Sequence, residues 1–156
     1  MNNFQFKRLL AIIILIILPS QITYSQDVFF ASNQAQHTKD IYFRSSQAQH
    51  TIDVYFSDIR TRNTKDIYIS NSGNYCDVSV NDRQTNYTDD IFFRNSQAQH
   101  TIDIYLRSSF AKHTKDIYIT NNISSASHVI CFPAGFKYDK KHIAAIAVLY
   151  FFDEDG

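Results

Sequence analysis

Tryptophan is absent from this chain of 156 residues, and glycine, proline and methionine number only three, two and one. The scarcity of glycine and proline excludes a chain that is disordered by composition. No run or face of basic residues is apparent, which argues against nucleic acid and against an anionic membrane surface as partners. Phenylalanine and tyrosine are abundant instead, with 13 and 10 residues, and supply ample apolar material for a core.

The sequence also lacks the signatures of common catalytic sites. It has no serine elbow, no Cys–His signature, no glycine-rich phosphate loop and no zinc-binding helix motif. His128 stands near Cys131, but this is only local proximity along the chain. We therefore expect a protein that is not an enzyme and that uses no cofactor.

One uninterrupted apolar run stands near the N-terminus, at residues 9–18 ("LLAIIILIIL"). Lys7 and Arg8 precede it, and small residues follow at Thr23 and Ser25, an order typical of a secretory signal peptide. We predict a signal peptide over residues 1–25, export to the periplasm, cell surface or medium, and no stable membrane span after cleavage. An N-terminal membrane anchor is the alternative. The remaining chain, residues 26–156, carries 13 basic and 15 acidic residues.

Two cysteines lie in the exported part, Cys76 and Cys131. An oxidising compartment permits a disulfide between them, which would close a long loop worth ~4 kcal/mol in the chain-entropy model. Two buried free thiols in strands are the alternative, since the sequence alone does not place the two Cα atoms.

An internal repeat organises the rest of the chain. Aspartates recur every 13 residues at positions 27, 40, 53 and 66. After one shorter step of 11 residues they recur every 13 residues again, at positions 77, 90, 103 and 116. Val129 occupies a ninth register. Residues 40–70 also align with residues 90–120 at 19 of 31 positions. We infer a duplicated block of four units in one domain, with halves at 27–76 and 77–128 and a closing segment at 129–156.

Each unit predicts a short strand followed by a polar turn. "DIYF", "DVYF" and "DIYI" are β-branched and aromatic, and both faces of such a strand are apolar, which predicts burial on both sides. The eight or so residues between strands fit a wide turn and are too few for a crossover helix. The apolar segment 142–152 ("HIAAIAVLYFF") is expected to form a closing strand or another buried element; a membrane-contacting tail is the alternative.

Polar residues recur at fixed places beside each strand. We interpret the Asp, and the Thr two residues before it, as turn residues whose side chains bond the backbone. Rows of Thr also suggest an ice-binding or carbohydrate-binding surface, a weaker alternative. Four histidines share one register, and converging imidazoles would bind Zn²⁺ or Cu²⁺. The candidate metal ligands are His37, His50, His100 and His113.

The spacing of the "IYF" strands resembles an uncharacterised bacterial family of 13-residue β-repeats. Its unit is of the type Lys-Ile-Tyr-Phe-Val, and its members end in an Ala-Gly-aromatic-Lys stretch and a Lys-Lys-His sequence, as in "AGFKYDKKHI" (residues 134–143) here. The resemblance covers residues 27 to about 150, although Asp replaces the family's Lys before each strand. It implies a closed ring of short strands, about nine in this chain, around which the backbone winds as a torus knot; it implies no biochemical activity.

The alternative architecture is a β-solenoid with two units in each 26-residue coil, which the step of 11 would interrupt. In either case we expect an exported, non-catalytic repeat protein with a structural or interaction role; metal binding through the histidines is the alternative function. Its partner is unknown, and a protein partner is the class we favour. The units that depart from the repeat, at residues 57–63 and 72–76, are the candidate contact segments.

Overall fold

The computed structural model describes residues 25–73 and 75–152. The first half contains strands β1 (Gln26–Ala31), β2 (Lys39–Phe43), β3 (Ile52–Phe56) and β4 (Thr64–Ser70). The second half contains β5 (Val78–Asn81), β6 (Asp89–Arg94), β7 (Ile102–Arg107) and β8 (Lys115–Thr120). The short helix η1 (Ile123–Ser125), strand β9 (His128–Cys131) and helix α2 (Lys140–Tyr150) follow. The predicted signal peptide lies outside the described residues, apart from Ser25.

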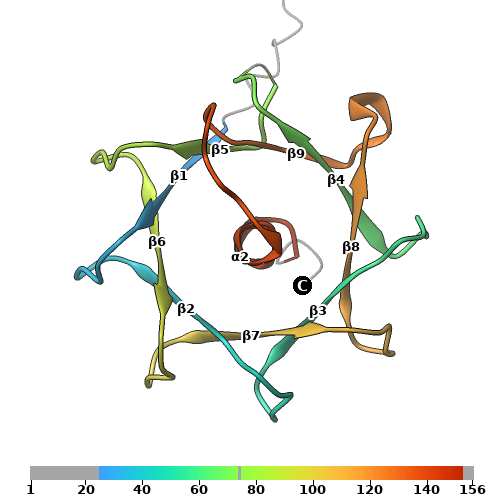
Figure 1. Ribbon diagram of the computed structural model, residues 1–156, viewed down its shortest axis with the longest axis horizontal. Helices are drawn as coiled ribbons and strands as arrows, with labels where there is room; N and C mark the ends of the chain where they lie inside the picture. The colour runs from blue at the N-terminus through green and yellow to red at the C-terminus, as the bar shows by residue number, and fades with distance from the viewer. Residues whose placement is uncertain (1–24, 74, 153–156) are drawn as a thin grey trace, which may run out of the picture.

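The nine strands form one closed ring in which every neighbouring pair is parallel (Figure 1). Around the ring the order is β1, β6, β2, β7, β3, β8, β4, β9, β5 and back to β1. Strands that follow each other along the chain are therefore not neighbours, because each connection skips one position. The prediction of a closed ring of about nine short strands is confirmed, and the solenoid alternative is wrong.

The duplication seen in the sequence has a direct counterpart in the ring. Each strand of the first block pairs with its own copy four units later, so that β2 lies beside β6, β3 beside β7 and β4 beside β8. The copies are staggered by two residues, since Asp40 is opposite Phe92 and not opposite Asp90. The same stagger of two residues recurs at the other neighbouring pairs except β5 and β9, where Val78 is opposite Ile130 and the units are in register.

The short strands explain why eight residues are enough for each parallel connection. A strand of five residues rises about 17 Å, and eight extended residues reach about 26 Å. The chain therefore returns to the starting side of the ring without a helix. The connections bow outward from the rim of the ring (Figure 1).

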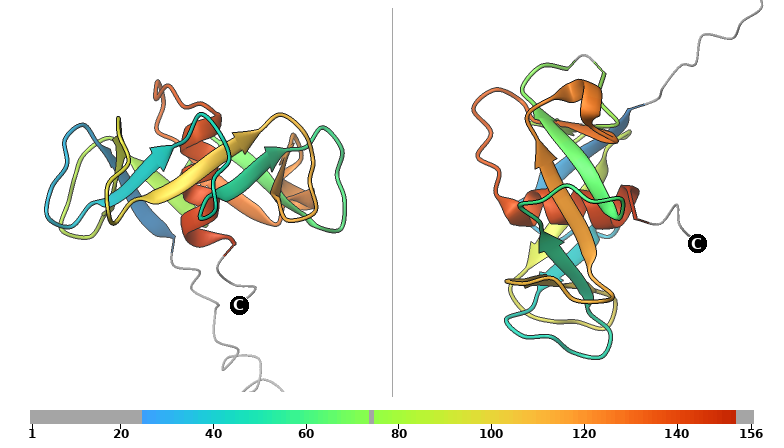
Figure 2. Two further views of the ribbon diagram at one scale, coloured as in Figure 1. Left: turned by 90° about the horizontal axis from the view of Figure 1, so that it is seen from below. Right: turned by 90° about the vertical axis from the view of Figure 1, so that its right-hand side faces the viewer.

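A layer of β-branched side chains around a central helix forms the middle of the core, and further aromatic and aliphatic side chains pack against this layer. Each strand contributes one fully buried Ile or Val, and these nine residues are Val28, Ile41, Val54, Ile67, Val78, Ile91, Ile104, Ile117 and Ile130. Helix α2 runs through the middle of the ring and is buried from Ile143 to Val148 (Figure 2). Its three alanines leave room for the surrounding side chains, and a helix that is apolar all round requires such burial.

Two expectations about burial need correction. The C-terminal apolar segment is a buried element, as one alternative proposed, but it is a helix and not a closing strand. Asp139 caps this helix by accepting hydrogen bonds from the backbone N–H groups of Lys141 and His142.

The expected burial of both strand faces is wrong, because the outward tyrosines, such as Tyr42 and Tyr55, are only partly buried. Within the described part of the chain, no helix is long and apolar enough to cross a membrane.

Candidate functional site

The turn that precedes each strand has one recurring geometry. The backbone N–H of Thr38 donates to the carbonyl oxygen of Ala35, and its hydroxyl donates both to that oxygen and to the carboxylate of Asp40. The same Thr–Asp bond recurs with Oγ1–Oδ1 distances of 2.6–3.0 Å at Thr51, Thr64, Thr88, Thr101 and Thr114. The Thr residues are thus turn residues, as predicted, whereas these carboxylates bond to side chains and not to backbone N–H groups.

The second oxygen of the aspartate joins neighbouring strands. The residue four places after one Asp lies at the end of its strand, and the two-residue stagger places it beside the Asp of the next strand. Three arginines in this register form ion pairs of 3.0–3.1 Å, namely Arg94 with Asp40, Arg44 with Asp103, and Arg107 with Asp53. Each of these guanidinium groups also donates to a glutamine six residues before the same Asp: Gln34, Gln97 and Gln47. We call this Arg–Gln–Asp arrangement the strand clamp.

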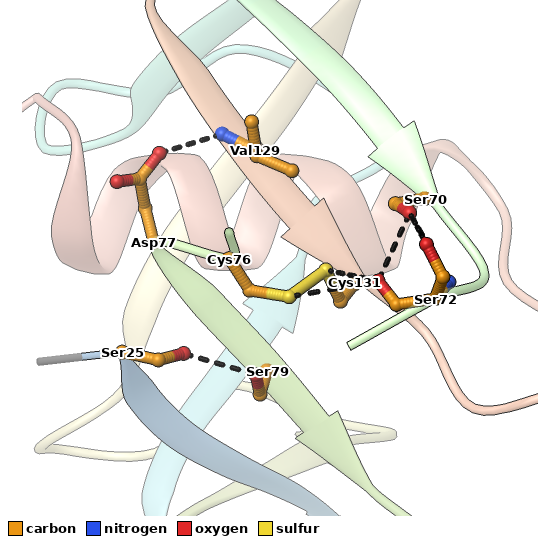
Figure 3. The surroundings of a disulfide bond; sticks show 8 residues. All are labelled: Ser25, Ser70, Ser72, Cys76, Asp77, Ser79, Val129 and Cys131. Atoms are coloured by element: carbon orange, nitrogen blue, oxygen red, sulfur yellow. Dashed lines mark hydrogen bonds between the residues drawn. A yellow bond between two sulfur atoms is a disulfide. The ribbon is translucent and has the colours of Figure 1, made fainter. Parts of the chain in front are cut away.

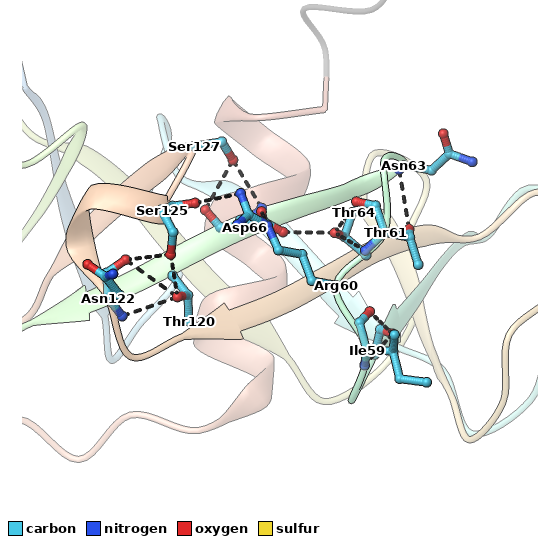
Figure 4. Close-up of polar contacts among 11 residues, drawn as sticks. Ile59, Arg60, Thr61, Asn63, Thr64, Asp66, Thr120, Asn122, Ser125 and Ser127 are labelled. Atoms are coloured by element: carbon cyan, nitrogen blue, oxygen red, sulfur yellow. Dashed lines mark hydrogen bonds and ion pairs between the residues drawn. The ribbon is translucent and has the colours of Figure 1, made fainter.

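The unit of Asp66 closes the clamp differently (Figure 4). Thr120 stands where the neighbouring strand would carry the arginine, and Arg60 stands where the unit would carry its glutamine. Arg60 forms an ion pair with Asp66 from within its own unit, and it also donates to the carbonyl oxygen of Ser125. The carboxylate is therefore neutralised even though the usual arginine is missing.

The neighbouring strands β3 and β8 provide neither an arginine nor a glutamine for the clamp. Ser57 replaces the arginine and Phe110 replaces the glutamine, so that Asp116 accepts only the hydroxyl of Thr114 among the side chains that the structure describes. A pocket of about 380 Å³ opens at this place. It is lined by Tyr55, Ser57, Ile59, Thr61, Asn63, Phe110 and Asp116. The predicted contact segment 57–63 thus forms one wall of a pocket beside a buried carboxylate.

Cys76 and Cys131 form a disulfide, with their Cα atoms 5.7 Å apart (Figure 3). The bond ties the start of β5 to the end of β9, the strand that lies between β4 and β5 in the ring. It therefore anchors the connection that contains the step of 11. Nearby, the carboxylate of Asp77 accepts the backbone N–H of Val129, at 2.7 Å.

The histidine register does not gather into one place. His37, His50, His100 and His113 are all exposed, because each occupies the third position of the tight turn that ends at the Thr. Among residues 25–73 and 75–152, no three His, Cys, Asp or Glu side chains lie close enough to hold a metal ion. Metal binding by this register stays a prediction. Zinc uptake by the protein, compared with a His50→Ala, His100→Ala variant, would test it.

A different ion pair lies on the inner face, where the strands begin. The ammonium of Lys39 contacts the carboxylate of Asp89 at 2.7 Å, and the hydroxyl of Tyr150 on α2 donates to the same oxygen at 3.0 Å. Burial opposes the ionisation of Asp89, but the hydrogen bonds from Lys39 and Tyr150 and the charge of Lys39 outweigh it and lower the pKa of this carboxyl. Burial, followed by the bond to Asp89, raises the pKa of Tyr150. These bonds fix the end of the helix to the ring.

No family model, curated protein or solved structure matches the chain significantly, so that its residues and geometry carry the functional argument.

The strand clamp and the pocket beside Asp116 were not predicted from the sequence. The signal was present, since Arg recurs four residues after three of the aspartates and Gln recurs six residues before five of them. Its meaning depends on the stagger between strands that lie 50 or more residues apart, which the periodicity alone does not give. Among the six aspartates that bond a threonine, the one that loses both partners can be recognised only once the clamp is known.

Proposed function

We propose that the protein is an exported, non-catalytic interaction module, in which a rigid ring presents its turns to a protein partner. One observation carries the proposal. Large apolar side chains lie exposed on the outward connections, with exposed fractions of 72% for Ile59, 86% for Tyr75, 88% for Tyr87 and 65% for Phe110. These residues stand in units that depart from the repeat, while the regular units carry small and polar residues at the rim. Exposed apolar residues on a rigid scaffold favour binding.

The chemistry of the regular units supports a structural role for them. Their Asp, Thr and Arg side chains bond to one another within the ring, and a carboxylate held by a guanidinium and a hydroxyl is a poor general base. The disulfide supports export, because disulfides persist in oxidising compartments. Together with the signal peptide expected over residues 1–25, this favours the periplasm, the cell surface or the medium.

We also propose that the backbone is a torus knot of the kind found in the 13-residue repeat family that the sequence resembles. The ring order supports this, since a chain that advances two positions at each connection passes almost twice around a ring of nine strands. The central helix follows the last strand and then passes through the ring (Figure 2). A crystal structure of the exported chain, traced from end to end, would test the knot. An unknotted trace would overturn it.

Site-directed photo-crosslinking in the native host tests the interaction role. A photoreactive residue at position 59 or 110 is expected to crosslink a defined protein in the compartment to which the chain is exported. The same residue at position 46 or 96, on two regular connections of the ring, is the matched control and is expected to give little product. Equal crosslinking from regular and irregular connections would contradict the proposal.

A further inference from the structure

Six aspartates accept a hydrogen bond from the threonine two residues before them, so that six equivalent carboxylates can be compared within one molecule. Asp40, Asp53 and Asp103 each receive an arginine from the neighbouring strand, and Asp66 receives Arg60 from its own unit. Asp90 receives the amide of Gln84. Of these six carboxylates, Asp116 alone has a single side-chain partner among the described residues, namely the hydroxyl of Thr114 at 2.6 Å.

Asp116 is also among the most buried members of the register, with an exposed fraction of 6%. Its Oδ1 atom accepts the threonine hydroxyl, and the carboxylate lines the pocket between β3 and β8. No fully buried side-chain oxygen of the described residues lacks a hydrogen-bond partner, so the other oxygen of Asp116 is reached from the pocket. A largely buried carboxylate is normally paired with a cation. The three strand clamps and Arg60 supply a guanidinium to four of the aspartates, and at Asp116 the position of that guanidinium is open.

The walls of the pocket suit a cationic group that also carries a planar or aliphatic part. Tyr55 and Phe110 supply aromatic rings, and Ile59 supplies an aliphatic wall, while Thr61 and Asn63 supply polar groups at the rim. An aromatic face attracts a planar guanidinium, which stacks on rings better than a compact ammonium does. At about 380 Å³ the pocket has room for a side chain together with its aliphatic stem.

We propose that this pocket binds a guanidinium group carried by an arginine side chain of the protein partner. The inserted arginine completes the clamp that Ser57 and Phe110 leave open, with its guanidinium donating to Asp116 as Arg107 donates to Asp53 one step away, at 3.1 Å. Its stem lies against Ile59 and an aromatic ring. The inference rests on the interaction role proposed above and specifies the chemistry by which the partner is recognised.

Isothermal titration of the intact exported protein with acetyl-Gly-Arg-Gly-amide tests the pocket directly. Saturable binding with one site is expected, and the same peptide with neutral citrulline in place of arginine is expected to bind at least about ten-fold more weakly, because charge-assisted hydrogen bonds are lost. Equal binding of the two peptides, or no binding of the arginine peptide, overturns the proposal. Tighter binding of agmatine than of the peptide would assign the site to a small guanidine and overturn the protein partner.

Three variants locate the binding. Asp116→Asn is expected to lower the affinity for the arginine peptide at least about ten-fold. Asp53→Asn, the matched control in a closed clamp, is expected to leave this affinity unchanged. Ser57→Arg restores the arginine of the repeat and is expected to abolish binding while the protein stays folded. Full binding by the Ser57→Arg variant would overturn the proposal even if Asp116→Asn failed to fold.

The two proposals fail in different ways. If position 59 crosslinks a partner but the arginine peptide does not bind, the interaction role stands and the guanidinium pocket falls. If the peptide binds and no partner crosslinks at positions 59 and 110, the pocket stands and the role proposed for it falls.

Discussion

Strand β3 pairs with β7 on one side and with β8 on the other, and the two pairs differ at the rim of the ring. In the step from β7 to β3, Arg107, Gln47 and Asp53 form a closed strand clamp. In the step from β3 to β8, Ser57, Phe110 and Asp116 occupy the corresponding positions and leave a pocket. Both steps have the same parallel pairing and the same two-residue stagger. The difference shows that the ring is held by its backbone and its inner layer, so that a clamp can be lost without loss of the fold.

The largest effect is expected where the two steps are alike. Ile104→Ala on β7 and Ile117→Ala on β8 each remove a fully buried side chain from the inner layer. Each is expected to lower the free energy of unfolding by about 2–5 kcal/mol, through lost transfer energy and a new cavity. Urea denaturation of both variants measures it. A much smaller cost on β8 than on β7 would mean that the open step is also loosely packed inside.

A smaller effect should separate the two steps. Asp53→Asn breaks a largely buried ion pair, in which the carboxylate is 10% exposed and the guanidinium 22%, and is expected to cost about 1–3 kcal/mol. Asp116→Asn removes a charge that has no cation beside it and is expected to cost under about 0.5 kcal/mol or to stabilise. Chemical denaturation of the two variants under the same conditions provides the comparison. Equal costs would indicate that the clamp adds nothing to stability.

Closing the open step is expected to have a modest stabilising effect. Ser57→Arg combined with Phe110→Gln copies the clamp of β7 and β3 onto β3 and β8. The free energy of unfolding is expected to rise by about 0.5–1.5 kcal/mol, the usual net value of such a bond after side-chain ordering. Thermal denaturation monitored by circular dichroism measures the change. A lower midpoint would show that Ile59 or Tyr55 obstructs the arginine.

The smallest effect concerns the inner face, where Lys39 and Asp89 are both more exposed than the clamp residues. Because the folded pKa of Asp89 lies below its ordinary value of about 3.9, this pair stabilises the fold above that pH and loses its effect as the pH falls through the folded pKa. In Lys39→Met the decline of stability between about pH 4 and pH 2 is expected to be shallower. Denaturation midpoints across that range, compared with the unchanged protein, measure it.

The repeat allowed the strands to be predicted from the sequence, but its period alone did not predict the helix or the pocket. The strands and their number follow from the regular "DIYF" units. The closure of the ring was implied by the resemblance to the family of 13-residue repeats, since the units alone also fit a β-solenoid. The helix was missed because an apolar run of eleven residues fits a strand or a helix equally well; Asp139 before it and its three alanines were the available signals. The pocket was missed because Phe110 and Ser57 lie more than 50 residues apart and meet only through the order of strands in the ring.

The stride of two around the ring also restricts how such a chain can grow or shrink. A walk that advances two places at a time visits every place only when the number of places is odd, as it is with nine. With eight strands the same walk would return to its start after four of them. The fifth strand would then meet an occupied place, and the four places in between would stay empty. Gain or loss of a single 13-residue unit is therefore incompatible with this winding, and lineages that keep it must change length by two units at once.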